Sequence, residues 1–187
     1  MRRYHPVLVA LHWLMALMIL FSLTAGGLVL ANLPQDSVEK VKGLGGHMAF
    51  GMAIGVLLLV RLVARITSGK PPRATTGHAL LDRISVWTHW GFYALIAAQV
   101  LTGLATAIGA GLFPIVYGGA AETLPPDLAS LPQRAAHAVF ALLLVALITL
   151  HIVAALYHQF VLKDGLVRRM WFGKRSSAGI GAISPST

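Results

Sequence analysis

The stretch "HAVFALLLVALITLH", residues His137 to His151, begins and ends with histidine and contains no charged residue. The residues between the two histidines have the composition of a segment that crosses a lipid bilayer. An α-helix turns about 100° per residue, so fourteen residues return the chain to nearly the same face, about 21 Å further along the axis. The stretch therefore predicts a membrane-spanning helix that presents two imidazoles at two depths.

The whole chain has the composition of an integral membrane protein. Of its 187 residues, 57% are hydrophobic and 11% are charged, against about a quarter charged in ordinary soluble domains. The sequence contains no cysteine, which excludes disulfides, thiolate metal sites, iron–sulfur clusters and thioether-attached haem. The net charge of +9 would suggest nucleic acid in a soluble protein, but in a membrane protein it has to be examined by position.

Four apolar stretches are long enough to cross the hydrocarbon core, which needs about 20 helical residues. None alternates strictly between apolar and polar residues, so we expect helices rather than barrel strands. The fold prediction is an all-α integral membrane protein, a four-transmembrane-helix bundle. The expected spans are Pro6–Ala31, Leu44–Ile66, Ile84–Ile108 and Ala135–Leu162.

Basic residues are distributed unequally between the two ends of these spans. Of the 15 Lys and Arg residues, all but three lie on the side that holds both termini, and the exceptions are Lys40, Lys42 and Arg134. The positive-inside rule therefore predicts that both termini are cytoplasmic. Because topology accounts for the excess of positive charge, nucleic acid is not an expected partner.

The connecting segments complete the predicted organisation. We expect one membrane domain over residues 1–175 and a small, polar tail at 176–187 that is disordered. The long outer segment Gly109–Gln133 contains four prolines, and we expect it to form a loop that folds over the membrane surface.

Four histidines within the spans predict two binding levels. His12 lies in the inner half of the first span, at the depth of His151 in the fourth. His47 lies in the outer half of the second span, at the depth of His137 in the fourth. Each level offers two imidazoles from different helices, as bis-histidine haem ligation in a bundle requires. The pattern predicts two haem groups and, because both axial positions are filled, electron transfer rather than oxygen activation.

Intramembrane histidines can also have roles that need no haem, and these alternatives stay open. A zinc or copper site would need ligands that converge on one point, usually with carboxylate or thiolate help, and the expected spans contain no Asp or Glu. A proton-coupled carrier would normally use an intramembrane carboxylate or a comparable relay. A purely structural role, in which an imidazole bonds to a neighbouring helix, is open to each histidine taken singly.

The remaining histidines are harder to assign. His89, near the inner end of the third span, could support a ligand, donate to a quinone or pack helices together. His158 lies two turns beyond His151 and close to the cytoplasmic surface. His5 and His78 are expected at the interface or in a loop.

Small residues surround one of the predicted ligands. Gly43, Gly51 and Gly55 fall on one four-residue row of the second span, and His47 fills the remaining position in that row. Such a face lets a neighbouring helix or a flat porphyrin approach closely.

Three segments resemble the bacterial cytochrome b561 family. They are "RRYHPVLVALHWLMALMIL" (2–20), "GGHMAFGMAIGVLLLVRLVAR" (45–65) and "HIVAALYHQFVLKDGLVRRMW" (151–171), and the resemblance covers about residues 4–172. It implies a four-helix, two-haem b cytochrome of the bacterial inner membrane. The resemblance also implies that His12 and His151 ligate the inner haem and that His47 and His137 ligate the outer one.

Within this family the chain resembles small stand-alone proteins described as superoxide oxidases. That resemblance implies electron transfer from superoxide on the periplasmic side to ubiquinone, with protons taken from the cytoplasm. The wider family implies an alternative, a non-enzymatic cytochrome b subunit that couples a periplasmic redox partner to the quinone pool. Lys40, Lys42 and Arg134 could attract the superoxide anion, contact haem propionates or be ordinary surface charges. No quinone-binding motif can be read from the sequence.

Overall fold

A computed structural model describes residues 4–68, 79–119 and 123–171. The described chain is helical, and four of its helical segments are long and apolar enough to cross a membrane. The prediction of four membrane-spanning helices is thus confirmed in number and kind, while the expected tail at 176–187 lies outside the described residues. The four segments are Pro6–Asn32, Val38–Thr67, Asp82–Gly109 and Pro132–Leu162.

The second of these segments, α2 (Val38–Thr67), begins earlier than its apolar stretch. The Ser37 side chain accepts a hydrogen bond from the backbone nitrogen of Lys40 at 3.2 Å, which satisfies one of the free donors at the helix start. The cap therefore extends the helix by more than a turn into polar sequence, which hydrophobicity alone did not predict.

Helix α1 (Pro6–Thr24) does not end in a regular α-helical turn. It continues as a π-helical segment, η1 (Ala25–Val29), and then as a 3₁₀ turn, η2 (Leu30–Asn32). Short π-helical segments are rare and occur frequently at functional sites. This one contains the glycine pair Gly26 and Gly27, and the first of them contacts an imidazole of the candidate site described below.

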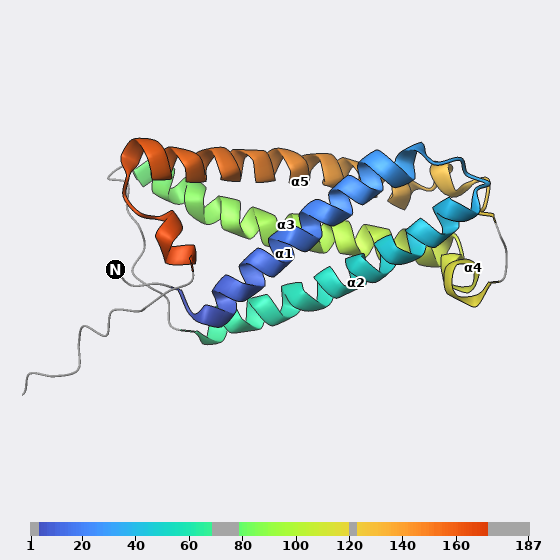
Figure 1. Cartoon of the computed structure of the whole chain (residues 1–187), viewed down its shortest axis with the longest axis horizontal. Coiled ribbons are helices and arrows are strands. Elements are labelled where there is room, and N and C mark those ends of the chain that lie inside the picture. The colour runs from blue at the N-terminus through green and yellow to red at the C-terminus, as the bar shows by residue number, and fades with distance from the viewer. Residues whose placement is uncertain (1–3, 69–78, 120–122, 172–187) are drawn as a thin grey trace, which may run out of the picture.

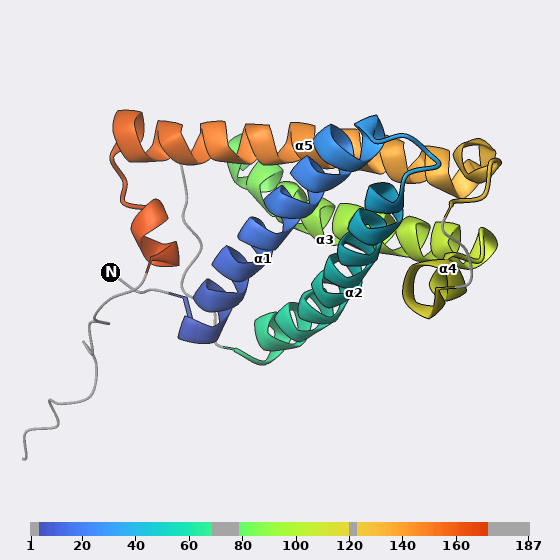
Figure 2. The ribbon, with the colours of Figure 1, turned by 45° about the vertical axis from the view of Figure 1, so that its right-hand side comes forward.

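The long helices pack in sequence order. Helix α1 packs against α2, α2 against α3 (Ala79–Gly109), and α3 against α5 (Pro132–Tyr157) (Figure 1). In the described residues α1 and α2 make at most sparse backbone contact with α5, and both diverge from it toward the beginning of α1 (Figure 2). Side chains rather than close backbone packing therefore connect α5 to α1 and α2.

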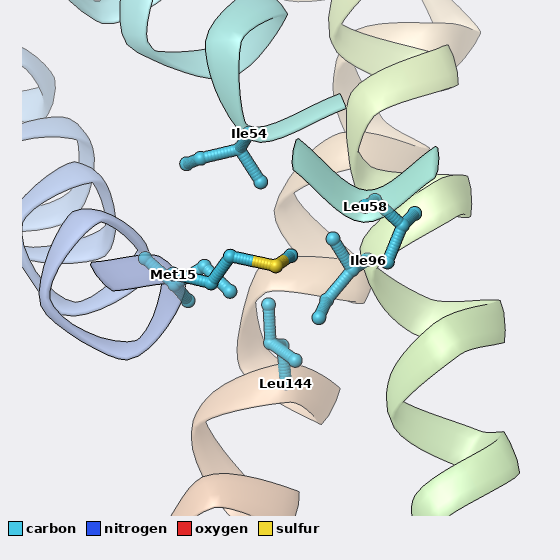
Figure 3. Packing of buried hydrophobic residues seen from close by; sticks show 6 residues of the cluster. Met15, Ile54, Leu58, Ile96 and Leu144 are labelled. Atoms are coloured by element: carbon cyan, nitrogen blue, oxygen red, sulfur yellow. The ribbon is translucent and has the colours of Figure 1, made fainter. Parts of the chain in front are cut away.

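An apolar cluster fills the middle of the bundle (Figure 3). Leu144 of α5 is its most buried member, with an exposed fraction of only 2%. Leu144 lies seven residues from both His137 and His151, so its helix register places the cluster midway between the two predicted levels. The buried members come from all four long helices and are Met15, Ile19, Ile54, Leu58, Ile96 and Leu144.

The segment expected as a long loop, Gly109–Gln133, is partly helical. It contains the short helix α4 (Leu112–Gly118) and the 3₁₀ turn η3 (Leu128–Ser130). Tyr117 donates a hydrogen bond from its hydroxyl to the Gly45 carbonyl at 2.8 Å. The segment therefore covers the beginning of α2 and the end of α3. Its residues Leu112, Leu124 and Leu128 form a second apolar cluster with Val41 of α2 and Ala107 of α3.

The chain folds back on itself after α5. A π-helical segment, η4 (His158–Leu162), ends at Lys163 in the left-handed conformation, and the 3₁₀ turn η5 (Val167–Met170) follows. The Trp13 indole donates to the Met170 carbonyl at 2.8 Å. The end of the described chain is thereby held against the beginning of α1, beside His12.

Candidate functional site

Two pairs of imidazoles face each other across the bundle. At one level, which we call outer after the predicted orientation, the rings of His47 (α2) and His137 (α5) lie 6.2 Å apart between centroids. At the inner level the rings of His12 (α1) and His151 (α5) lie 6.4 Å apart. The structure therefore brings together the two pairs that their depths in the spans predicted, and α5 contributes one ring to each.

The separation within each pair matches the requirement for one metal atom between two imidazoles. Metal–imidazole bonds are about 2 Å long, so two rings bonded to one atom on opposite sides have centroids roughly 6 Å apart. Both pairs also connect helices that make little backbone contact with each other, as a flat group between them would require. The donor set, two half-buried imidazoles without an accompanying carboxylate, suits haem iron.

Polar groups orient both outer imidazoles. His137 donates from Nδ1 to the Gln99 carbonyl at 3.0 Å, and the Thr102 hydroxyl lies 3.3 Å from the same nitrogen. The Ser22 hydroxyl lies 3.3 Å from Nδ1 of His47. Because Nδ1 of His137 carries the proton, its Nε2 presents a lone pair, the form that binds a metal.

The Gln99 side chain shares the space next to that lone pair. Its amide nitrogen donates to Nε2 of His137 at 3.0 Å. Its amide oxygen is buried and has no hydrogen-bond partner in the described part of the chain. A single hydrogen bond therefore holds the amide. An iron atom bound to Nε2 of His137 would replace the amide at that nitrogen.

Aromatic rings surround the inner imidazoles. The His151 ring contacts those of Phe92 and His89, at centroid distances of 5.3 and 6.2 Å. The His12 ring lies 5.3 Å from that of Trp13. Within the described residues, neither His12 nor His151 has a hydrogen-bond partner for a ring nitrogen.

Glycines let the chain pass close to the outer imidazoles. A Cβ atom at Gly26 would lie 2.9 Å from Cε1 of His47, and one at Gly103 would lie 3.0 Å from Cε1 of His137. Neither glycine was among the predicted site residues. The "AGG" sequence at the end of the first span was the available signal for Gly26, but its position opposite His47 depends on how α1 and α2 pack.

The predicted glycine row of α2 has a different role at each position. Gly43 accommodates Leu30, and Gly55 accommodates Val100 of α3, with Cβ positions 2.7 and 3.0 Å from those side chains. A Cβ at Gly51, one turn beyond His47, would meet nothing within 4 Å. Two of the three glycines therefore serve helix packing, and only Gly51 adjoins open space on the histidine face.

The other histidines fall outside the two pairs, with one exception. His5 accepts from the backbone nitrogen of Val7 and caps α1, and His78 lies outside the described residues. His89 joins the inner level as a third imidazole, and it donates from Nδ1 to the Ser85 carbonyl at 2.6 Å. His158 lies beyond the inner level and pairs with Asp164 at 2.5 Å.

Asp164 fixes the turn that follows η4. Its carboxylate accepts hydrogen bonds from His158 and from the backbone nitrogen of Leu166. Partial burial raises the pKa of Asp164, but the two hydrogen bonds and the nearby positive charge outweigh it and hold that pKa below its ordinary value of 3.8. The carboxylate is therefore ionised near neutral pH and stabilises the turn that leads to Met170.

One arginine accompanies each level. Arg61 of α2 donates to the Leu8 carbonyl at 3.2 Å and interacts electrostatically with His12. Arg134, one turn before His137, interacts electrostatically with both outer imidazoles. Positive charge is thus available near both pairs. No group of three or more metal-binding side chains converges on one point in the described chain.

Comparison with known proteins identifies the family to which the chain belongs. The family model described as "Prokaryotic cytochrome b561" matches residues 3–173. The chain is 28% identical to a protein named probable superoxide oxidase CybB in Yersinia pestis, over 93% of this chain and 98% of that one. It is 33% identical to cytochrome b562 of Cereibacter sphaeroides, over 89% of this chain and 94% of that one. It is 28% identical to cytochrome b561 homolog 2 of Escherichia coli, over 94% of each chain. The chain is therefore a membrane cytochrome of the prokaryotic cytochrome b561 family.

Proposed function

We propose that the protein holds two haem b groups, one between His47 and His137 and the other between His12 and His151. The observation that carries this proposal is the pair of ring separations, 6.2 and 6.4 Å, at two levels that share α5. Membership of a cytochrome b family supports haem b as the cofactor. When bound, haem with two imidazole ligands supplies reversible one-electron transfer and leaves no open iron position for oxygen.

The proposed orientation places both termini in the cytoplasm of a bacterial cell and the outer level near the periplasm. The unequal distribution of Lys and Arg supports this orientation. The outer end then carries α4 and η3, and the inner end carries the turn formed by His158 and Asp164. The protein would thus lie in the inner membrane with lipid around its four spans.

The proposed reaction is the oxidation of superoxide by ubiquinone. Two superoxide ions each lose one electron and become two molecules of dioxygen. One ubiquinone gains these two electrons and two protons, taken from the cytoplasm, and becomes ubiquinol. The relative from Yersinia pestis, which carries the name of a probable superoxide oxidase, supports this assignment.

Residues at the outer end suit an anionic donor. Arg134 lies near both outer imidazoles. The Lys40 ammonium group donates to the uncharged Leu33 carbonyl at 2.7 Å, so its positive charge is not neutralised by that partner. Such charges raise the local concentration of an anion, and the same positive charge of Arg134 would favour a haem propionate nearby.

The apolar cluster around Leu144 has a separate part in the proposed mechanism. It fills the space between the two levels with close-packed side chains from all four long helices. A packed apolar layer excludes water and keeps the effective dielectric constant low. Electrons can therefore cross this layer between the levels without a water path for protons beside them.

The second candidate is a cytochrome b subunit that passes electrons from a periplasmic redox protein to quinone. The relative from Cereibacter sphaeroides favours it, because that protein is more similar in sequence and is named only as a cytochrome. The two candidates share the haem sites and the direction of transfer. They differ in whether superoxide alone is a sufficient donor.

Purified, haem-loaded protein in detergent distinguishes the candidates. An enzymatic source supplies superoxide at a constant rate, and formation of ubiquinol is followed by its absorbance. We expect ubiquinol to form in the presence of this protein, and we expect added superoxide dismutase to suppress its formation. The matched control is His47→Ala, which removes one outer imidazole. Two haems per chain without superoxide-dependent ubiquinol would favour the electron-transfer subunit, and protein without haem would contradict both candidates.

A further inference from the structure

The two imidazole pairs have the same chemistry but different hydrogen bonds. Each pair consists of two half-buried histidines, one of them from α5, with a ring separation of about 6 Å. Each pair also has one arginine within electrostatic reach. Ligand type and nearby positive charge therefore do not distinguish the outer level from the inner one.

Hydrogen bonding at Nδ1 does distinguish them. The Thr102 hydroxyl donates its proton to the Ala98 carbonyl at 2.7 Å, so toward Nδ1 of His137, 3.3 Å away, it acts as an acceptor. The Gln99 carbonyl accepts from the same nitrogen at 3.0 Å. When iron binds Nε2 of His47, its Nδ1 carries the proton and the Ser22 hydroxyl accepts it, at a distance of 3.3 Å.

Among the residues that the structure describes, no equivalent acceptor bonds to the inner pair. In the described residues the ring nitrogens of His12 and His151 have no hydrogen-bond partner, and aromatic rings flank both imidazoles. A proton on Nδ1 of either ring is therefore not drawn toward an oxygen atom.

An acceptor at Nδ1 makes a metal-bound imidazole more basic. A more basic ligand donates more electron density to the iron and favours the ferric state, which lowers the reduction potential. We propose that Ser22 and Thr102 are positioning residues that give the outer haem the lower reduction potential, so that electron transfer from the outer to the inner level is energetically downhill. This inference rests on the proposed function for the identity of the ligands.

Redox titration of the purified protein, followed by haem absorbance, tests the inference. We expect two one-electron components. His47→Ala should remove the component of lower potential, and His12→Ala the component of higher potential. The opposite assignment would overturn the proposal. Loss of the higher component in His89→Ala but not in His12→Ala would overturn it too, because the imidazole of His89 has a carbonyl acceptor.

Hydroxyl removal gives the sharper measurement. Ser22→Ala takes away the acceptor of His47, and we expect the lower component to be about tenfold easier to reduce, equivalent to about 59 mV for one electron. Thr102→Val leaves the Gln99 carbonyl in place, so a shift of about threefold in the same direction is expected. The higher component should stay unchanged in both variants.

Two further variants separate hydrogen bonding from packing. Thr102→Ser keeps the hydroxyl and should retain the original potential. Thr106→Val removes a hydroxyl one turn away whose hydrogen-bond partner is the Thr102 carbonyl, and it should leave both potentials unchanged. Equal shifts in Thr102→Val and Thr106→Val, or no shift in Ser22→Ala, would overturn the proposal. If the potentials shift as expected but superoxide does not reduce quinone, the choice of donor fails and this inference stands.

Discussion

The outer and inner histidine levels of this protein are built from the same residue type but differ in how tightly their surroundings define them. The outer level has two imidazoles, oriented by Ser22, Gln99 and Thr102 and closely approached by two glycines. The inner level has three imidazoles, because His89 lies as close to His151 as His12 does. Polar contacts and close backbone approach therefore specify one level, whereas aromatic packing surrounds the other.

This difference shows what each helix contributes. Helix α5 carries one imidazole of each pair, and α1 and α2 carry the rings that face it from helices with little backbone contact to α5. Helix α3 packs directly against α5 and contributes the neighbours, Thr102 at the outer level and Phe92 and His89 at the inner one. The two levels are therefore built in the same way, and His12 and His151 at the inner level correspond to His47 and His137 at the outer one.

The largest expected effect is loss of one haem from either level. His47→Ala and His12→Ala should each lower the haem content of purified protein from about two per chain to about one, because an imidazole ligand is removed from one site only. Pyridine haemochrome absorbance per chain measures this content. A variant that retained both haems would show that the altered histidine is not a ligand.

Crowding one outer imidazole should have the next largest effect. Gly26→Ala places a Cβ atom 2.9 Å from the His47 ring, and overpacking of this kind typically costs about 1–3 kcal/mol. We expect a lower thermal midpoint in detergent and a perturbed outer haem component. Gly27→Ala is the matched control, since its Cβ would meet nothing within 4 Å and the change raises helix propensity by up to about 1 kcal/mol. Equal destabilisation by both would contradict the close approach.

A smaller effect is expected at the inner end, where Asp164 holds the turn that leads to η5. The folded-state pKa of Asp164 lies below its ordinary value of 3.8. Ionised Asp164 therefore stabilises the fold above pH 3.8, and this stabilisation is lost as the pH falls through the folded-state pKa. Asp164→Asn should therefore lower the thermal midpoint at pH 7 slightly, and the difference from the unaltered protein should shrink as the pH is lowered below 3.8. A difference that is independent of pH would contradict this role.

The smallest expected change is at His89. If His12 and His151 form the inner pair, His89→Ala should keep both haems and alter only the environment of the inner one, seen as a small shift of its absorbance band. His89→Phe restores an aromatic ring beside His151 and should reverse part of that shift. Loss of a haem in both variants would show that His89 of α3, rather than His12 of α1, is the inner ligand.

The membrane class, the four spans and the depths of the four histidines could be predicted from the order of residues alone. These follow from runs of apolar residues and from the fixed rise of a helix, which are local properties of the chain. Hydrophobicity placed most span ends within a few residues. It missed the extension of α2 from Ser37, because a side-chain cap leaves little hydrophobic signal. It also missed helix α4, because that helix is short, contains Pro114 and lies between Gly111 and Gly119.

The groups that meet at each level could not be predicted in this way, because they depend on how the helices pack. That His47 lies beside Ser22 and Gly26, and His137 beside Thr102 and Gly103, depends on the rotation of α1 and α3 about their own axes. Helix rotation in a membrane is set by packing against neighbours rather than by the hydrophobicity of the span. For the same reason the third imidazole, His89, could be assigned to the inner level only once α3 and α5 were placed side by side.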